Sequence, residues 1–183
     1  FGTFTCGQVY IFKYMLESWI QEAIIPTGDV ITNNYFGTCL KIDGTGQRVV
    51  IGSRSDKAYI YGRNNGAWSL ELRIAKSRSF GRYVSISGDG KRVIIGEVDY
   101  TVENVYSSLG AVYIYSKVNT GWTSGTQVLP SFKRSGLQFG CSVDISGNGA
   151  TAVVGAYEMS LGGVGMVGGG SPGATSGQVH IFS

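Results

Sequence analysis

The chain contains a single histidine, His180, and this scarcity limits the kinds of catalysis that the sequence can support. A Ser-His-Asp or Cys-His site would have to recruit this one residue as its base. His180 stands, however, where three related segments have tyrosine, at Tyr10, Tyr59 and Tyr113. A histidine that replaces an aromatic residue in a strand is better explained by packing than by proton transfer. We therefore predict that the protein is not an enzyme. A carboxylate pair brought together by folding, as in glycoside hydrolases, is the open alternative.

Cysteines are also few, and their odd number suggests no pairing scheme. Cys6, Cys39 and Cys141 occupy different positions relative to the repeated motifs described below, so a disulfide would require two of their strands to be adjacent. The simpler interpretation is small buried side chains with free thiols. The sequence has no Cys-x-x-Cys motif and no Cys/His cluster, which argues against a zinc site. No cofactor is predicted.

Charged residues make up only 15% of the chain, below the usual share of about 25%. No apolar run approaches the roughly 18 residues of a membrane-spanning helix, so no membrane span is predicted. The net charge of +3 is uneven, because residues 41–92 hold eleven Lys and Arg against four Asp and Glu. That stretch could bind an anion or a polysaccharide, although solvated strand edges and turns are the simpler explanation. Few aromatic residues interleave with the basic ones, so no nucleic-acid partner is predicted.

Repetition is what the sequence has in abundance. Three Phe-Gly pairs are each followed by a glycine that closes an apolar run sixteen residues after the Phe; the pairs are Phe36 and Gly52, Phe80 and Gly96, and Phe139 and Gly155. A motif of aromatic and β-branched residues occurs four times, at residues 9–12, 59–61, 112–115 and 179–182. Tryptophan follows three of these motifs at a constant distance, as Trp19, Trp68 and Trp122. Self-similarity at a period of about 45 to 60 residues indicates an array of one supersecondary unit.

Each unit is predicted to form four strands. The segment after Phe-Gly alternates in polarity, as strands do, and ends in a turn rich in Gly, Asp and Asn, such as residues 87–90. The apolar run that follows suits a strand covered on both faces. The aromatic motif and the segment after tryptophan supply the third and fourth strands. Residues 14–25 are the only segment that could be helical, and the repeat spacing assigns them to strands as well.

A four-stranded unit that is apolar on both faces must pack against a neighbour of the same kind. We therefore predict an all-β fold, a β-propeller or partial propeller of four-stranded antiparallel blades with about 13 strands. The single propeller segment, residues 1–183, divides into a partial blade at 1–35, blades at 36–79 and 80–138, and a partial blade at 139–183. This strand count does not close a ring of four-stranded blades. We expect the rest of a longer chain, or other copies of the chain, to complete it.

Connections of unequal length are predicted to gather at one end of these sheets. The spacing between the second and third strands varies among the units, whereas the spacing from Phe to the closing glycine and the spacing from the aromatic motif to tryptophan are constant. Unequal loops on a rigid scaffold are where binding residues usually lie. The predicted ligand-binding residues are Glu97, Asp99, Tyr100 and Glu103 in one loop, Tyr157 in a second, and Asp29, Asn34 and Tyr35 in a third. The carboxylates of the first loop could contact Ca²⁺, but their spacing matches no calcium-ligand pattern, and no metal site is predicted.

The repeated motifs resemble the FG-GAP repeat of integrin-α-like β-propellers. The likeness covers nearly the whole chain and is clearest in residues 139–155 and 177–182. The resemblance implies a ring of blades, an extracellular or surface setting, and adhesion or ligand binding through the variable face. The chain departs from the family at the calcium loop, where Asp43, Asp89 and Asn148 stand alone in their turns. One carboxylate cannot supply the oxygens that Ca²⁺ requires, so calcium binding is not carried over.

The leading functional expectation is a non-catalytic binding or adhesion module that recognises a protein or glycan through the variable loops. Its expected location is extracellular, on a cell surface or on a virion surface. The alternative is a structural component of a larger assembly, such as a virion, fibre or surface filament, that packs through propeller contacts. Fold analogy alone does not choose between them.

Overall fold

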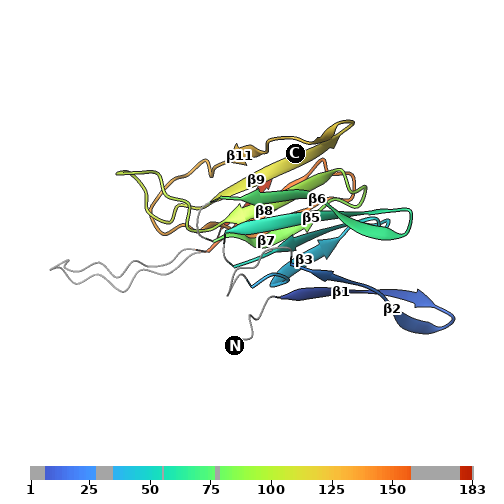
Figure 1. Ribbon diagram of the computed structural model, residues 1–183. Coiled ribbons are helices and arrows are strands. Elements are labelled where there is room, and N and C mark those ends of the chain that lie inside the picture. The colour runs from blue at the N-terminus through green and yellow to red at the C-terminus, as the bar shows by residue number, and fades with distance from the viewer. Residues whose placement is uncertain (1–6, 28–34, 55, 77–78, 158–177, 183) are drawn as a thin grey trace, which may run out of the picture.

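The computed structural model describes residues 7–27, 35–54, 56–76, 79–157 and 178–182. These residues form fourteen β-strands in four antiparallel sheets, with no helix among them (Figure 1). It follows that no helix in the described part of the chain is long and apolar enough to cross a membrane.

The four sheets follow one another in chain order. The first contains β1 (Gln8–Met15) and β2 (Ser18–Pro26). The second contains β3 (Cys39–Ile42), β4 (Arg48–Gly52), β5 (Lys57–Asn64) and β6 (Ala67–Ala75). The third contains β7 (Phe80–Ile86), β8 (Arg92–Glu97), β9 (Ala111–Val118), β10 (Gly121–Trp122) and β11 (Thr126–Val128). The fourth contains β12 (Phe139–Ile145), β13 (Ala152–Ala156) and β14 (Gln178–Phe182).

The predicted all-β class is confirmed, and so is the assignment of residues 14–25 to strands, because β1 and β2 pair as an antiparallel hairpin. The predicted number of strands is one too low. The fourth strand of the third sheet is split into β10 and β11, which both pair with β9. The split falls at Gly125, whose φ of +86° lies in the left-handed region and interrupts the ladder.

Each sheet packs face to face on the next, and one apolar cluster fills each of the three junctions. The first strands of the second, third and fourth sheets are β3, β7 and β12, which we call the inner strands. They are neighbours in space (Figure 1). The cluster between the second and third sheets is the largest, with Ile60 and Val50 packed against Ile95 and Tyr113. The second strands of the second and third sheets, β4 and β8, are buried on both faces, which agrees with their non-alternating apolar runs. Burial alternates along β13, because the fourth sheet has one uncovered face.

The Phe-Gly motif has a physical reason in this packing. Gly81 has a φ of +85°, which strains any residue with a side chain. Its carbonyl oxygen lies against Gly52 of the preceding sheet so closely that a Cβ atom at Gly52 would collide with it. The carbonyl oxygen of Gly140 blocks a Cβ atom at Gly96 in the same way. The glycine that closes the apolar run and the glycine of the next Phe-Gly therefore form one inter-sheet contact.

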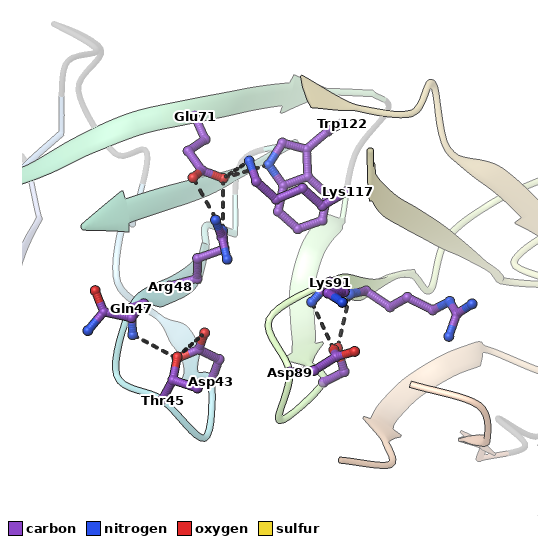
Figure 2. A network of polar contacts seen from close by, with 11 residues as sticks. Asp43, Thr45, Gln47, Arg48, Glu71, Asp89, Lys91, Lys117 and Trp122 are labelled. Carbon is purple, nitrogen blue, oxygen red and sulfur yellow. Dashed lines mark hydrogen bonds and ion pairs between the residues drawn. The ribbon is translucent and has the colours of Figure 1, made fainter. Parts of the chain in front are cut away.

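The first turn of each unit is aligned with the first turn of the next. The Gly44 amide donates to the Gly88 carbonyl at 3.0 Å, and the Asp89 amide donates to the Gly147 carbonyl at 2.9 Å. Asp43 stabilises its own turn, because its carboxylate accepts hydrogen bonds from the Thr45 hydroxyl and the Gln47 amide (Figure 2). Equivalent turns thus form a ladder along the inner strands.

The phenylalanine of each Phe-Gly motif packs edge-on against the aromatic motif of its own sheet. Ring centroids are 5.1 Å apart for Phe36 and Tyr59, and 5.7 Å apart for Phe80 and Tyr113. The third such pair is Phe139 and His180, at 5.1 Å. His180 therefore takes the packing role of tyrosine, as the sequence predicts.

Candidate functional site

The connections of unequal length emerge at one end of the sheets, which we call the loop end. There the Lys76 amide donates to the Asp56 carbonyl at 3.0 Å, which joins the β4–β5 connection to the segment after β6. In the third sheet, the Gln138 amide donates to the Ser108 carbonyl at 3.0 Å and joins the β8–β9 connection to the segment before β12. The predicted gathering of these connections is confirmed for the described residues.

The longest described connection at this end, residues 98–110, is held by its own backbone. Val102 and Tyr106 form an isolated antiparallel bridge, and the Gly110 amide donates to the Tyr100 carbonyl at 3.1 Å. Val98 and Leu109 are buried at its base. In Figure 1 the loop projects beyond the ends of β8 and β9. It is a fixed protrusion on the scaffold.

The structure separates the four predicted residues of this loop. Asp99 and Glu103 are exposed on the protrusion, and Tyr100 is half-buried at its base. Glu97 is only 1% exposed, because β8 extends to this residue and pairs it with Ala111. Glu97 is thus placed in the interior, where a ligand at the surface does not reach it.

Glu97 belongs to a buried polar group with the tyrosines of β9. Burial first, and then a hydrogen bond to the Glu97 carboxylate, raise the pKa of Tyr113 well above its usual value. Burial and the charge of Glu97 raise the pKa of Tyr115 to about 12. The Gln127 side chain donates to the Tyr113 hydroxyl at 2.8 Å, and the Lys76 ammonium lies 4.2 Å from the centroid of the Tyr113 ring. Both phenols stay protonated at neutral pH, so neither tyrosine is available as a general base.

The other predicted residues are divided between described and undescribed parts of the chain. Tyr157 is exposed at the end of β13, and Tyr35 is exposed beside the Arg54 guanidinium, whose carbon lies 5.7 Å from the ring centroid. Asp29 and Asn34 lie outside the described residues. Cys39 and Cys141 carry free thiols, as predicted, and Cys6 lies outside the described residues.

A polar network that the sequence analysis did not predict joins the second sheet to the third. Glu71 on β6 accepts hydrogen bonds from Arg48 Nε at 3.2 Å, Lys117 Nζ at 2.9 Å and Trp122 Nε1 at 2.8 Å (Figure 2). Burial acts to raise the pKa of Glu71, but the hydrogen bonds from these three donors together outweigh it and hold the pKa below its usual value. The carboxylate is therefore ionised and binds two cations from different sheets.

The same link recurs between the first and second sheets, where Glu22 on β2 pairs with Arg63 on β5. Glu22 follows Trp19 at the distance at which Glu71 follows Trp68, so the two carboxylates are equivalent positions of the repeat. Aligning the units on tryptophan is the signal that could have found this link. At the third junction the equivalent residue is Gly125, which offers no carboxylate.

A pocket at the loop end opens between the second and third sheets. It has a volume of about 340 Å³ and is lined by Thr38, Cys39, Arg54, Arg82 and Tyr83. None of the described residues that line it is acidic. The sequence shows a basic surplus over residues 41–92, but it does not predict that two arginines share a pocket.

Within the described residues, no group of three or more His, Cys, Asp or Glu side chains is placed to hold a metal ion. No protein-family model matches the chain, and no curated protein matches it. Function is therefore inferred from the loop end, its protrusion and its pocket.

Proposed function

We propose that the four sheets are consecutive blades of a β-propeller and that the chain is a non-catalytic binding module on this scaffold. Repeat-equivalent contacts at successive junctions support the propeller architecture, above all the glycine contacts and the aligned inner turns. Radial arrays of this kind place their unequal connections on one face. The resemblance to FG-GAP repeats agrees with such a scaffold in an extracellular, cell-surface or virion-surface protein.

The observation that carries the proposed function is the protrusion of residues 98–110. A loop that holds its shape before binding loses less conformational entropy when a partner docks. The protrusion presents Asp99 and Glu103 to solvent, and Val105, two residues after Glu103, is exposed as well. An acidic rim with an apolar contact suits a protein or glycan ligand.

The double variant Asp99→Ser/Glu103→Ser is expected to lose binding. If the protrusion contacts the ligand, removal of both carboxylates should weaken ligands found by glycan array or pull-down by about tenfold or more. Circular dichroism should be unchanged, because both side chains are exposed. The control is Glu17→Asn, which removes a carboxylate from the β1–β2 turn at the opposite end and keeps a residue that tolerates its φ of +62°. Equal binding by the double variant and the control would contradict the proposal.

A second candidate, a structural role in an assembly, is favoured by uncovered apolar surface in two places, on β3 beside the two-stranded first sheet and on the outer face of the fourth sheet. Leu40 and Ile42 on β3 are 48% and 46% exposed, whereas their repeat equivalents Val84 and Ile86 are 5% and 2% exposed. On β14, Val179 and Ile181 are 74% and 70% exposed. The repeat-equivalent surface is covered between the second and third sheets. Further strands beside the first sheet and a further sheet on the fourth would therefore cover the two exposed surfaces.

Sedimentation velocity tests this second candidate. The chain is expected to form larger species as its concentration rises, and Ile181→Ser should shift the distribution towards the monomer because it removes apolar contact area. Val105→Ser, at an apolar site on the loop that is 59% exposed, is the control and should leave the distribution unchanged. A chain that stays monomeric over the whole concentration range would count against an assembly made of copies of this chain.

A further inference from the structure

The pocket between the second and third sheets has the features of an anion-binding site. Thr38, Cys39 and Arg54 come from the second sheet and its connections, and Arg82 and Tyr83 come from β7 of the third. The two sheets meet closely here, since the Cys39 thiol lies 4.0 Å from the Val84 carbonyl oxygen. A pocket of about 340 Å³ lies within the range of small-ligand sites.

Among the residues that the structure describes, neither arginine of this pocket has an ion-pair partner. The ion pairs of the described residues involve other cations, at Lys41, Arg48, Arg63 and Lys117. Arg82 Nε is buried from solvent and has no hydrogen-bond partner among the described residues. A buried donor without an acceptor costs free energy, and an anionic ligand that accepts from it recovers that cost. This pocket therefore differs from the Glu71 network, where the protein supplies the carboxylate itself.

Aromatic side chains stand beside the arginines. Tyr83 lines the pocket and is partly exposed, and the Arg54 guanidinium lies over the Tyr35 ring at 5.7 Å. Stacking on a tyrosine face orients a guanidinium and leaves its donors at the edge free for a carboxylate. A second tyrosine face is a suitable platform for the apolar face of a sugar ring.

We propose that this pocket binds the carboxylate of an acidic sugar, such as a uronic acid within an oligosaccharide. Arg54 and Arg82 donate to the carboxylate, and Tyr83 packs against the sugar ring. Planar guanidinium groups match carboxylate geometry, which favours this anion over a spherical one. The inference rests on the proposed role of the chain as a binding module, and it names a ligand class for a part of the loop end other than the protrusion.

Isothermal titration calorimetry with oligogalacturonate tests the inference. The wild-type chain is expected to bind it, and a neutral galactose oligomer of the same length should bind at least tenfold more weakly. Arg54→Ala and Arg82→Ala should each lower the affinity for oligogalacturonate by about tenfold or more. Arg92→Ala, which removes an exposed arginine at the opposite end of the third sheet, is the matched control and should bind normally. Arg54 is exposed, so its variant remains informative if Arg82→Ala fails to fold.

Two further measurements test whether the ligand binds in this pocket and whether the pocket recognises a sugar ring. Alkylation of Cys39, followed by peptide mass spectrometry, should slow when oligogalacturonate is present, while alkylation of Cys141 in the fourth sheet should not change. Tyr83→Ser should weaken oligogalacturonate but leave the affinity for a polyglutamate peptide unchanged. Equal binding of both ligands by the wild type, with no effect of Tyr83→Ser, would overturn the sugar assignment in favour of an acidic peptide. Unchanged binding in both arginine variants would overturn the site.

The variants distinguish a failure of the pocket as a ligand site from a failure of the protrusion as a binding surface. Asp99→Ser/Glu103→Ser leaves the pocket intact, so it should retain oligogalacturonate binding. In one outcome, the arginine variants lose this ligand while the protrusion variant keeps every array and pull-down partner. That result would support the pocket as a binding site and contradict the proposed role of the protrusion. The reverse pattern would overturn the pocket alone.

Discussion

Replacing Gly52 by alanine is expected to lower the free energy of unfolding by about 3 kcal/mol or more, one of the largest single-site effects in the chain. The added Cβ atom would collide with the backbone carbonyl of Gly81 in the next sheet. A backbone atom cannot rotate away as a side chain can, so the second and third sheets would have to separate. Gly52 does not need a left-handed conformation, so the change isolates the close approach of the two sheets.

The control is Gly147→Ala, because a Cβ atom at Gly147 meets no atom within 4 Å and its φ is not left-handed. Urea denaturation should show a change of less than about 1 kcal/mol for this variant. If Gly52→Ala were as stable as Gly147→Ala, the sheets could not lie as close as the glycine contact requires, and the explanation of the Phe-Gly motif would be wrong.

Glu71→Gln is expected to lower the free energy of unfolding by about 2 kcal/mol. The carboxylate binds Arg48 and Lys117, and all three side chains are about a quarter exposed or less. An amide of the same shape leaves both cations largely buried without a counter-charge, which costs more than the exchange of one hydrogen-bond acceptor for another. The estimate is below the full cost of a buried pair because solvent still screens part of the network.

The acid sensitivity of stability should change with the same variant. The pKa of Glu71 is lowered in the folded state, so its contribution is fully present above the pKa of the unfolded chain. That contribution is lost as the pH falls through the lowered folded-state pKa. Glu71→Gln should therefore flatten the acid side of the stability curve measured by urea denaturation at several pH values.

The exposed pair of Lys41 and Asp144 is the control for this experiment. Their side chains are 52% and 58% exposed and 3.8 Å apart. Lys41→Met should change the free energy of unfolding by less than about 1 kcal/mol, because exposed pairs contribute little. A similar loss in Lys41→Met and Glu71→Gln would mean that the Glu71 network is not a special link between sheets.

The contacts within a unit could be predicted where a motif has one physical cause. The constant distance from Phe36 to Gly52 reflects a hairpin of fixed length, and the aromatic position shared by Tyr59 and His180 reflects one packing site opposite the Phe of each unit. Such features depend on neighbours within a single unit. For this reason the strands, their order and the packing role of His180 could be inferred from the sequence.

Features that depend on two units at once were harder to predict. The equivalence of Glu22 and Glu71 is visible in the sequence, but their partners Arg63 and Lys117 belong to the next sheet. Glu97 seemed to begin a loop, and it is buried because β8 continues for one residue beyond the glycine of its apolar run. The pocket at Arg54 likewise forms only when two sheets meet.

Equivalent turns of successive sheets lie against one another along the inner strands, and the packing of the sheets depends on this contact. Nuclear Overhauser spectroscopy on the isotope-labelled chain tests it most directly, because the Gly44 amide donates to the Gly88 carbonyl and a Cβ at Gly88 would lie 3.1 Å from the Cα of Gly147. The structure predicts cross-peaks between Gly44 and Gly88 and between Gly88 and Gly147. If both cross-peaks were missing while those within each hairpin were present, the sheets would not be stacked in register.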